Sequence, residues 1–418
     1  MNTQSLHAYA YRDIYEQYVS EASFLWVMRS IAVNQPHYKV VDIKRIEARV
    51  QAHLTGLMTS MDMAWPLCEE ALEQHSPGEV FTAAIIAFKS HDRLKIQKVV
   101  EAGLVSHAST KALLSAIAWL PSEISHPWIQ RFLVSKHIDH RYLAIFLCSM
   151  RRENPGDFLT KFLQSDDCLQ HEKLQVRCLR LIGELKRHDL VPALNRALQS
   201  DNESIAFWAA WSAILLGNKD LVQKMESHLF RESIYHDRAL DVAFRVLPVS
   251  EARSWITQLA ADPQHTRSVI KATGILGDLQ AVNWLIEKMK DIAYARLAGE
   301  AFSQITGLNL EQNELQAMPP QNYVPMPNDD ASDTQVAMEE DENLLWPNAA
   351  LVAASWEQSS HQFIKGQRYL LGKEINASNV SHHLQQAYQR QRHAAAMELA
   401  VGAASHILQN TRAKVTQA

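Results

Sequence analysis

The most regular feature of the chain is a repeated pair of short apolar helices, clearest between residues 174 and 202. Apolar residues of the first helix recur at i, i+4, i+7, i+8 and i+11, namely Leu174, Cys178, Leu181, Ile182 and Leu185. A polar turn at residues 186–189 interrupts the pattern. A second helix starts near Pro192, where a missing backbone N–H is harmless. The window therefore predicts two antiparallel helices followed by a polar loop.

The same pattern recurs along the chain at intervals of about 31 residues. We place the ends of successive first helices near eight positions: Ser90, Pro121, Arg151, Gly183, Gly217, Pro248, Gly277 and Gly307. One short helix pair cannot bury its apolar face alone, whereas stacked pairs form a continuous core. Glycine at the end of a first helix would suit a left-handed cap residue. The pattern thus predicts a helical-repeat array.

The predicted fold is all-α: a HEAT-like α-solenoid, a right-handed superhelix of antiparallel helix pairs. The windows 174–198, 207–229 and 267–307 resemble the short HEAT-like repeat, with Val176-Arg177 and Leu276-Gly277-Asp278 at its recognisable places. Arrays of this kind include scaffolds, adaptors, inhibitors and some enzymes, so the resemblance implies an architecture and leaves function to a site.

Four segments are expected from the changes in pattern and composition. Residues 1–75 are predicted to form an atypical helical cap with a break at Asn34-Gln35-Pro36, and residues 76–307 the repeat array. Residues 308–342 contain nine acidic side chains, four prolines and no Lys or Arg, which indicates a linker or a disordered loop. Residues 343–418 are expected to be a basic helical C-terminal segment.

Charge suggests how the last two segments interact. Residues 361–418 carry seven Lys or Arg side chains against two acidic ones. The acidic linker and the basic segment could pair within the chain, which we favour, or the basic segment could bind an acidic partner surface. Nucleic acid is the third choice of partner for the basic segment, because the basic residues are sparse and the net charge of the chain is −5.

Composition narrows the class of protein further. Four cysteines form no CxxC pair, and nineteen histidines form neither HxxxH nor HExxH, so we expect no disulfide framework, metal site or cofactor. The first twenty residues lack a basic leader with an apolar core, and no apolar run approaches the roughly 20 residues of a membrane span. These features predict a cytoplasmic protein without a membrane contact.

Several aromatic and basic residues are candidates for partner binding. Trp208 and Trp211 share a helix face. Such a pair more often packs in a buried seam between repeats than serves as an exposed anchor for a partner. The stronger candidates follow the acidic linker: Trp346, Trp356, Arg368, Tyr369, Arg390 and Arg392. The two tryptophans could instead dock the C-terminal segment on the rest of the chain. For Tyr369 we prefer the interpretation that it packs on the last repeat.

The ends of the chain are similar to one group of proteins. FLWVMRSIAVNQPHY, AGEAFSQITGLNL, GQRYLLGKEI and QRQRHAAAMELA resemble a proteobacterial HEAT-repeat family of unknown function, often encoded near type VI secretion components. The resemblance and the missing catalytic motifs lead us to expect a non-catalytic scaffold, such as an adaptor, chaperone or immunity-type partner of a secretion component or effector. The alternative is an enzyme or small-ligand-binding protein with a site between the repeats and the C-terminal segment.

Overall fold

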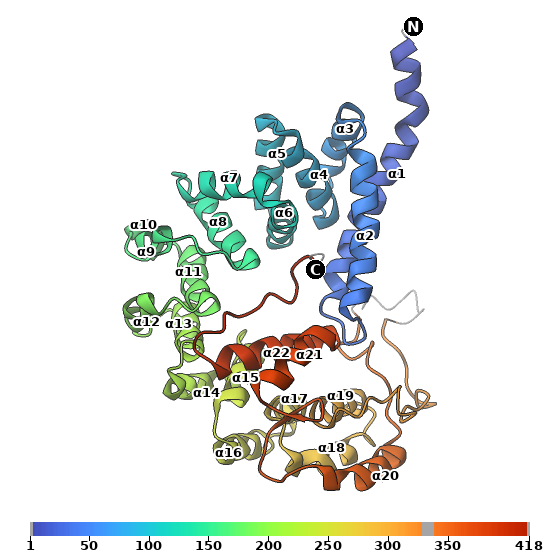
Figure 1. Cartoon of the computed structure of the whole chain (residues 1–418), viewed down its shortest axis with the longest axis vertical. Coiled ribbons are helices and arrows are strands. Elements are labelled where there is room, and N and C mark those ends of the chain that lie inside the picture. Colours follow the sequence, from blue (N-terminus) through green and yellow to red (C-terminus); the bar gives the residue numbers. More distant parts are fainter. Residues whose placement is uncertain (1–2, 328–337, 416–418) are drawn as a thin grey trace. The chain divides into compact units, whose positions relative to one another are not determined.

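The computed structural model describes residues 3–327 and 338–415 and shows an all-α, solenoid-like fold. Within these residues the chain forms 22 α-helices and a single two-stranded hairpin. It divides into two compact units, one formed by Met1–Ser212 with Gln409–Ala418 and the other by Ala213–Leu408. The predicted helical class is confirmed, and each unit is described in turn (Figure 1).

The first unit is built from helix pairs that follow a long N-terminal helix. Its helices are α1 (Thr3–Ala32), α2 (Val40–Leu57), α3 (Met61–Leu72), α4 (Pro77–Ser90), α5 (Arg93–Leu104), α6 (His107–Trp119), α7 (Ser122–Leu133), α8 (Ile138–Arg151), α9 (Asp157–Phe162), α10 (Asp166–Leu169), α11 (Glu172–Leu185) and α12 (Val191–Ala197). Helix α13 (Glu203–Leu215) contains the boundary between the two units.

The second unit continues the pairs and adds a C-terminal extension. Its helices and strands are α14 (Glu226–Phe230), α15 (His236–Val246), α16 (Val249–Leu259), α17 (Thr266–Leu276), α18 (Val282–Lys288), α19 (Ala295–Thr306), α20 (Ala349–Ser359), β1 (Tyr369–Leu370), β2 (Lys373–Glu374), α21 (Ala377–Gln386) and α22 (Gln389–Gly402). Five short 3-10 helices are η1 (His188–Leu190), η2 (Lys219–Met225), η3 (Pro263–His265), η4 (Leu279–Ala281) and η5 (Ser360–Gln362).

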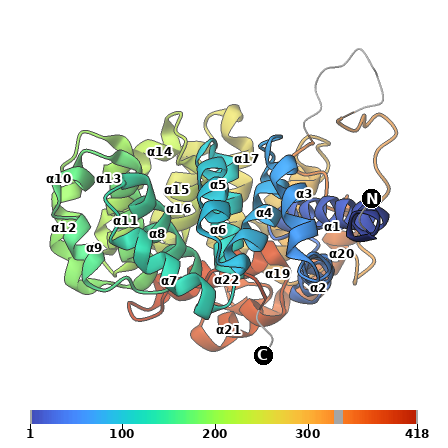
Figure 2. The same ribbon diagram turned by 90° about the horizontal axis from the view of Figure 1, so that it is seen from above.

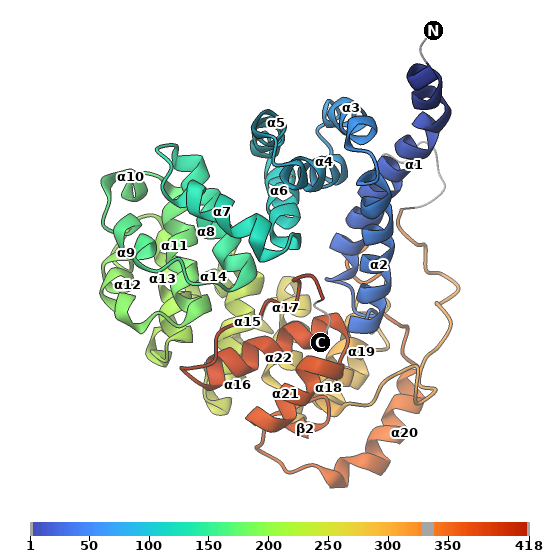
Figure 3. The same ribbon diagram turned by 45° about the horizontal axis from the view of Figure 1, so that its top comes forward.

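All eight predicted ends of first helices lie within two residues of an observed helix end. The helices concerned are α4, α6, α8, α11, α13, α15, α17 and α19. Successive first helices pack on one another, α4 on α6 and α6 on α8 in the first unit, and α15 on α17 and α17 on α19 in the second. The second helices α5 and α7 flank the first of these rows (Figures 1 and 2), and α16 and α18 flank the second (Figures 1 and 3). The apolar stripes therefore form the core of each unit.

Glycine has two different roles where first helices end. Gly277 and Gly307 are left-handed caps with φ of +70° and +73°, as predicted. The prediction is wrong for Gly183, which lies inside α11, while Lys186 forms the left-handed cap. A Cβ on Gly183 would stand 2.7 Å from the Cα of Ser212 on α13. This glycine is needed because two helices approach closely there.

The start of the chain contains more helices than the single capping pair that the sequence suggested. Residues 3–75 form three helices, and α1 is 30 residues long. The predicted break at Asn34-Gln35-Pro36 separates α1 from α2. Among the described residues, no helix combines the length and the apolar character that crossing a membrane requires.

The tryptophan pair on α13 lies in a seam between helices. Trp208 and Trp211 are buried and meet edge to face with ring centroids 5.3 Å apart. The guanidinium of Arg180 on α11 lies 4.6 Å from the centroid of the Trp208 ring. The seam interpretation of this pair therefore agrees with the structure.

The described parts of the predicted linker pack against the repeats of the second unit. Leu310 and Leu315 are buried in the core that α18 and α19 share with α20. The backbone N–H of Ala317 donates to the carbonyl of Trp346, and that of Asn348 to the carbonyl of Leu315. The middle of the predicted linker, residues 328–337, lies outside the described residues.

Candidate functional site

Arg368 and Tyr369 attach the β1–β2 hairpin to the repeats. The Arg368 guanidinium donates to the carbonyls of Leu276 (2.8 Å) and Arg245 (2.9 Å) and to the Glu398 carboxylate (2.7 Å). Tyr369 is buried, and its backbone N–H donates to the carbonyl of Gly277 at 2.8 Å. The preferred interpretation, packing of Tyr369 on the repeats, agrees with these contacts.

Trp346 and Trp356 also contact side chains of their own unit. Trp356 is 9% exposed, and its ring lies against Phe302 and Phe363. Trp346 is half-buried, edge to face with Tyr323, and the guanidinium of Arg296 lies 4.8 Å from its centroid. Both tryptophans therefore act as docking contacts within the second unit.

The last two candidates have acceptors within the unit as well. Arg390 on α22 donates to both carboxylate oxygens of Glu300 on α19, at 3.2 and 3.1 Å. Arg392 donates to the carbonyl of Leu384 at 2.8 Å, and burial lowers its pKa. The structure places all six candidates in the second unit, and partner binding through them stays a prediction.

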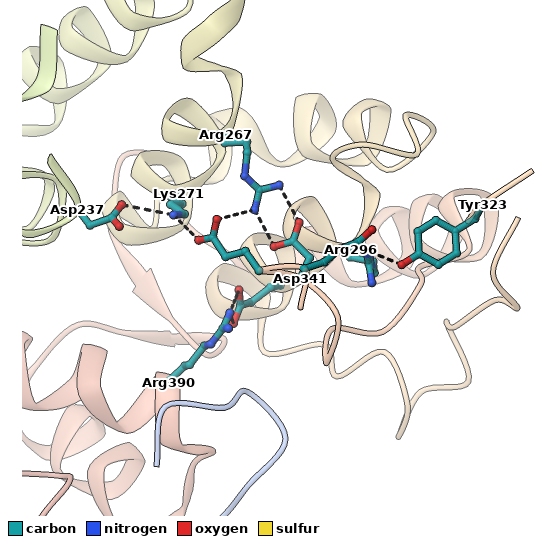
Figure 4. Close-up of polar contacts among 10 residues, drawn as sticks. Asp237, Arg267, Lys271, Arg296, Tyr323, Asp341 and Arg390 are labelled. Atoms are coloured by element: carbon teal, nitrogen blue, oxygen red, sulfur yellow. Dashed lines mark hydrogen bonds and ion pairs between the residues drawn. The ribbon is translucent and has the colours of Figure 1, made fainter. Parts of the chain in front are cut away.

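Three consecutive acids, Glu339, Glu340 and Asp341, form an acidic strap over the first helices α17 and α19 (Figure 4). Asp341 accepts two hydrogen bonds of 2.8 Å from Arg267. Glu340 accepts from Lys271 at 2.6 Å, and Glu339 pairs with Arg296.

These contacts correct the predicted charge pairing for the three strap acids, whereas the linker acids within residues 328–337 lie outside the described residues. The described strap acids pair with cations of the repeats, whereas Arg390 of the basic segment pairs with Glu300. The reason is proximity: α17 and α19 present their cations where the chain returns. Burial raises the pKa of Glu340, but Lys271 and Arg267 outweigh it and lower that pKa. Ion pairs thus attach the acidic strap to helices α17 and α19, where it has a structural role.

A second constellation, in the first unit, was missed by the sequence reasoning. We call it the Arg29–Glu47 groove. A cleft of about 970 Å³ opens there, and its wall is formed by the helices together with residues 410 and 412–415 of the 409–415 segment. The helices contribute Arg29 from α1, Lys44, Glu47, Ala48 and Gln51 from α2, Ser115, Ala118 and Trp119 from α6, and Met150 and Arg151 from α8.

The groove is centred on a buried ion pair between α1 and α2. Arg29 is 5% exposed and Glu47 is 4% exposed. Arg29 donates from Nε and Nη2 to Oε1 of Glu47, at 3.0 and 2.7 Å. Burial lowers the pKa of Arg29, and the carboxylate of Glu47 opposes that shift. Buried charges of this kind need further hydrogen bonds to offset their desolvation.

The 409–415 segment supplies those hydrogen bonds with its backbone. Arg29 donates to the carbonyls of Arg412 (3.0 Å) and Ala413 (2.8 Å), and the N–H of Val415 donates to Glu47 at 2.9 Å. Asn410 donates from its side chain to the carbonyl of Met150 at 2.7 Å. The ion pair thus binds a stretch of polypeptide backbone.

Two side chains of the segment occupy distinct places in the groove. The Lys414 ammonium lies 4.6 Å from the centroid of the Trp119 ring. Burial lowers the pKa of Lys414, with Lys89 and Arg29 adding to the shift and Glu47 opposing it. Val415 packs against the apolar cluster of Ala32, Val33 and Ile43.

Simple energetics place docking of the segment near balance. Three hydrogen bonds to charged groups contribute roughly 1.5–3 kcal/mol each, about 5–9 kcal/mol in all. Ordering seven residues costs about 1–2 kcal/mol each, about 7–14 kcal/mol in all. The contacts of Lys414 and Val415 contribute the remaining few kcal/mol. Docked and released states therefore lie within a few kcal/mol of each other.

The sequence did hold a signal for this groove. Arg29 stands on the apolar face of α1, three residues after Trp26 and three before Ala32. Glu47 stands on the apolar stripe of α2, between Ile43 and Val50. A charged residue at a core position requires a buried partner, so each position indicates such a contact.

The described residues contain no group of His, Cys, Asp and Glu side chains arranged to hold a metal ion. Comparison with protein-family models and with curated proteins finds no match to this chain.

Proposed function

We propose that this protein is a non-catalytic protein-binding scaffold whose first unit holds a turn-containing polypeptide segment in the Arg29–Glu47 groove. The observation that carries the proposal is the 409–415 segment itself. Its backbone accepts two hydrogen bonds from Arg29 and donates one to Glu47. A site built to satisfy a buried ion pair with backbone groups suits a polypeptide ligand, because every polypeptide offers the same carbonyls and N–H groups.

The finer parts of the proposal rest on the repeat pattern and on the ends of the sequence. We place the protein among HEAT-like repeat proteins of the cytoplasm. Within that group it would act as an adaptor, chaperone or immunity-type partner of a type VI secretion component or effector. Its mechanism would be steric, since a preformed groove engages a segment of the partner without chemistry.

Site-specific photo-crosslinking tests this proposal. A crosslinking amino acid replaces Lys44, which is exposed and lines the groove. We expect it to capture a partner in cells of the native organism, and we expect Glu47→Gln to abolish the capture. The matched control places the same group at Lys290, an exposed residue of the second unit. Equal capture from both positions, or none from Lys44, would contradict the proposal.

The charge of the cleft favours one alternative, a small anionic ligand. Its lining includes six cationic side chains (Arg29, Lys44, Arg151, Arg152, Arg412 and Lys414) and the two carboxylates Glu47 and Glu153. A ligand that binds only the folded state raises its stability by mass action. Phosphate or citrate at millimolar concentration should then raise the melting temperature of the wild-type chain, and Arg151→Gln should reduce that gain. No such gain would dismiss the alternative.

A further inference from the structure

The 409–415 segment shows what a ligand of the Arg29–Glu47 groove must contain. We propose that the groove binds a segment of a partner protein that makes the turn seen at residues 410–413 and in which a basic residue is followed directly by a β-branched apolar residue, and that the chain's own Lys414-Val415 is a tethered competitor for that site. This inference rests on the function proposed above and adds the ligand class and its regulation.

The backbone contacts explain binding without explaining selection. Arg29 donates hydrogen bonds to the carbonyls of residues 412 and 413, and Glu47 accepts one from the N–H of residue 415. Any segment that makes the same turn as residues 410–413 offers these groups at this spacing. Specificity must therefore come from side chains: Asn410 donates to the carbonyl of Met150 and Arg412 to Asn34, and the two positions after Ala413 add two further contacts.

The first of these positions favours a cation. Lys414 lies over the face of Trp119, and a ring face attracts a positive charge. Trp119 is itself held in place, because its indole N–H donates to Gln51 on α2 at 3.4 Å. The carboxylate of Glu47 adds attraction, whereas Arg29 and Lys89 oppose it. An acidic side chain would meet the negative ring face and the Glu47 carboxylate instead.

The second position favours a compact apolar side chain. Val415 packs on Ala32 and Val33 at the end of α1 and on Ile43 of α2, with Tyr38 and Ile46 beside them. Most of these side chains are apolar, so a charged group there would lose its hydration. A β-branched residue also suits the non-helical backbone that follows the turn at Lys414 and Val415.

A segment from another chain can make all these contacts, because they come from consecutive residues of one short stretch. The chain's own stretch is connected to α22 through residues 403–408. Such a short connection holds a ligand at an effective concentration of about 1 mM. The chain's own segment therefore sets a threshold that a partner must exceed, either by higher affinity or by additional contacts.

The test uses the full chain with Lys414→Glu and Val415→Asp, which should release the segment while leaving the groove intact. The ligand is a labelled peptide, Gln-Asn-Thr-Arg-Ala-Lys-Val, blocked at both ends and followed by fluorescence polarisation. We expect saturable binding to the released variant. Competition at about 1 mM would weaken a peptide of about 10 µM Kd by about 100-fold in the wild-type chain. Gln409→Glu, an added charge on an exposed residue, should behave as wild type.

Two altered peptides test the ligand class. Replacing Lys by Glu, or Val by Asp, should weaken binding to the released variant at least about 10-fold. Equal binding of all three peptides would overturn the basic–apolar preference and leave the protein-binding function standing. No binding of any peptide to a released variant with wild-type helical content would overturn the inference, whereas the Lys44 crosslink tests the function separately. A concentration-dependent dimer with exchanged segments would identify a second copy as the ligand and overturn the partner proposal.

Discussion

Glu184 is the residue whose loss should damage the first unit most clearly. It lies on α11 with a fully buried side chain, and Ser149 on α8 donates to it. Arg152 and Arg180 pair with its carboxylate at 3.2 and 2.8 Å. Arg177 is joined to this network through a hydrogen bond of 2.7 Å to Ser149. One carboxylate thus balances three guanidinium groups that lie between successive first helices.

The magnitude of the effect follows from the pKa of Glu184. Burial alone would raise it, but Arg152, Arg180 and Arg177 lower it from 4.5 to about 2. A shift of about 2.5 units corresponds to about 3 kcal/mol at neutral pH, by 1.36 kcal/mol per unit. Removing one partner of a buried ion pair typically costs about 3–5 kcal/mol. We therefore expect Glu184→Gln to lower the free energy of unfolding of the first unit by about 3 kcal/mol.

The pH dependence of this loss has a definite sign. The folded-state pKa lies below the unfolded one, so the stabilisation is fully present above pH 4.5 and is lost as the pH falls toward 2. Glutamine cannot titrate. The difference in stability between the wild-type chain and Glu184→Gln should therefore shrink as the solution is acidified.

Urea unfolding followed by circular dichroism, at neutral pH and at about pH 3, measures both effects. Glu172→Gln is the matched control, because Glu172 is an exposed carboxylate on the same helix, and its loss should cost less than about 1 kcal/mol. A loss below about 1 kcal/mol for Glu184→Gln, or a loss unchanged at acidic pH, would refute the reasoning.

Three further predictions concern other parts of the chain. Gly277→Ala should destabilise the second unit by about 2 kcal/mol or more in urea unfolding, because φ is +70° and a Cβ would stand 2.2 Å from the Tyr369 carbonyl; Gly402→Ala, with open space around it, should cost nothing. Glu47→Gln should speed amide hydrogen exchange across residues 409–415, because Arg29 loses its counter-charge. An unchanged exchange rate would show that the ion pair does not hold this segment. Burial raises the pKa of Cys68 and of Cys148 to about 12, so both thiols should resist iodoacetamide in the folded protein at neutral pH and react in urea, as mass spectrometry can show.

The local pattern of the sequence was sufficient for the helices. Apolar spacing predicted the ends of all eight first helices to within two residues, because a helix buries one stripe and must end where the stripe ends. The seam of Trp208 and Trp211 followed from the same periodicity. The cap prediction failed at Gly183. This glycine is needed because α13 approaches α11 closely, and the spacing of residues along α11 does not reveal such a tertiary contact.

Charge pairing needed the tertiary structure. The sequence showed acidic and basic segments, but which acid meets which base depends on where the chain returns, and the strap acids meet Arg267, Lys271 and Arg296. The groove is the extreme case. Arg29 and Glu47 were visible as charges on apolar stripes, yet their backbone ligand lies more than 360 residues further along the chain. Periodicity reports only which face of a helix is buried, whereas folding decides what covers that face.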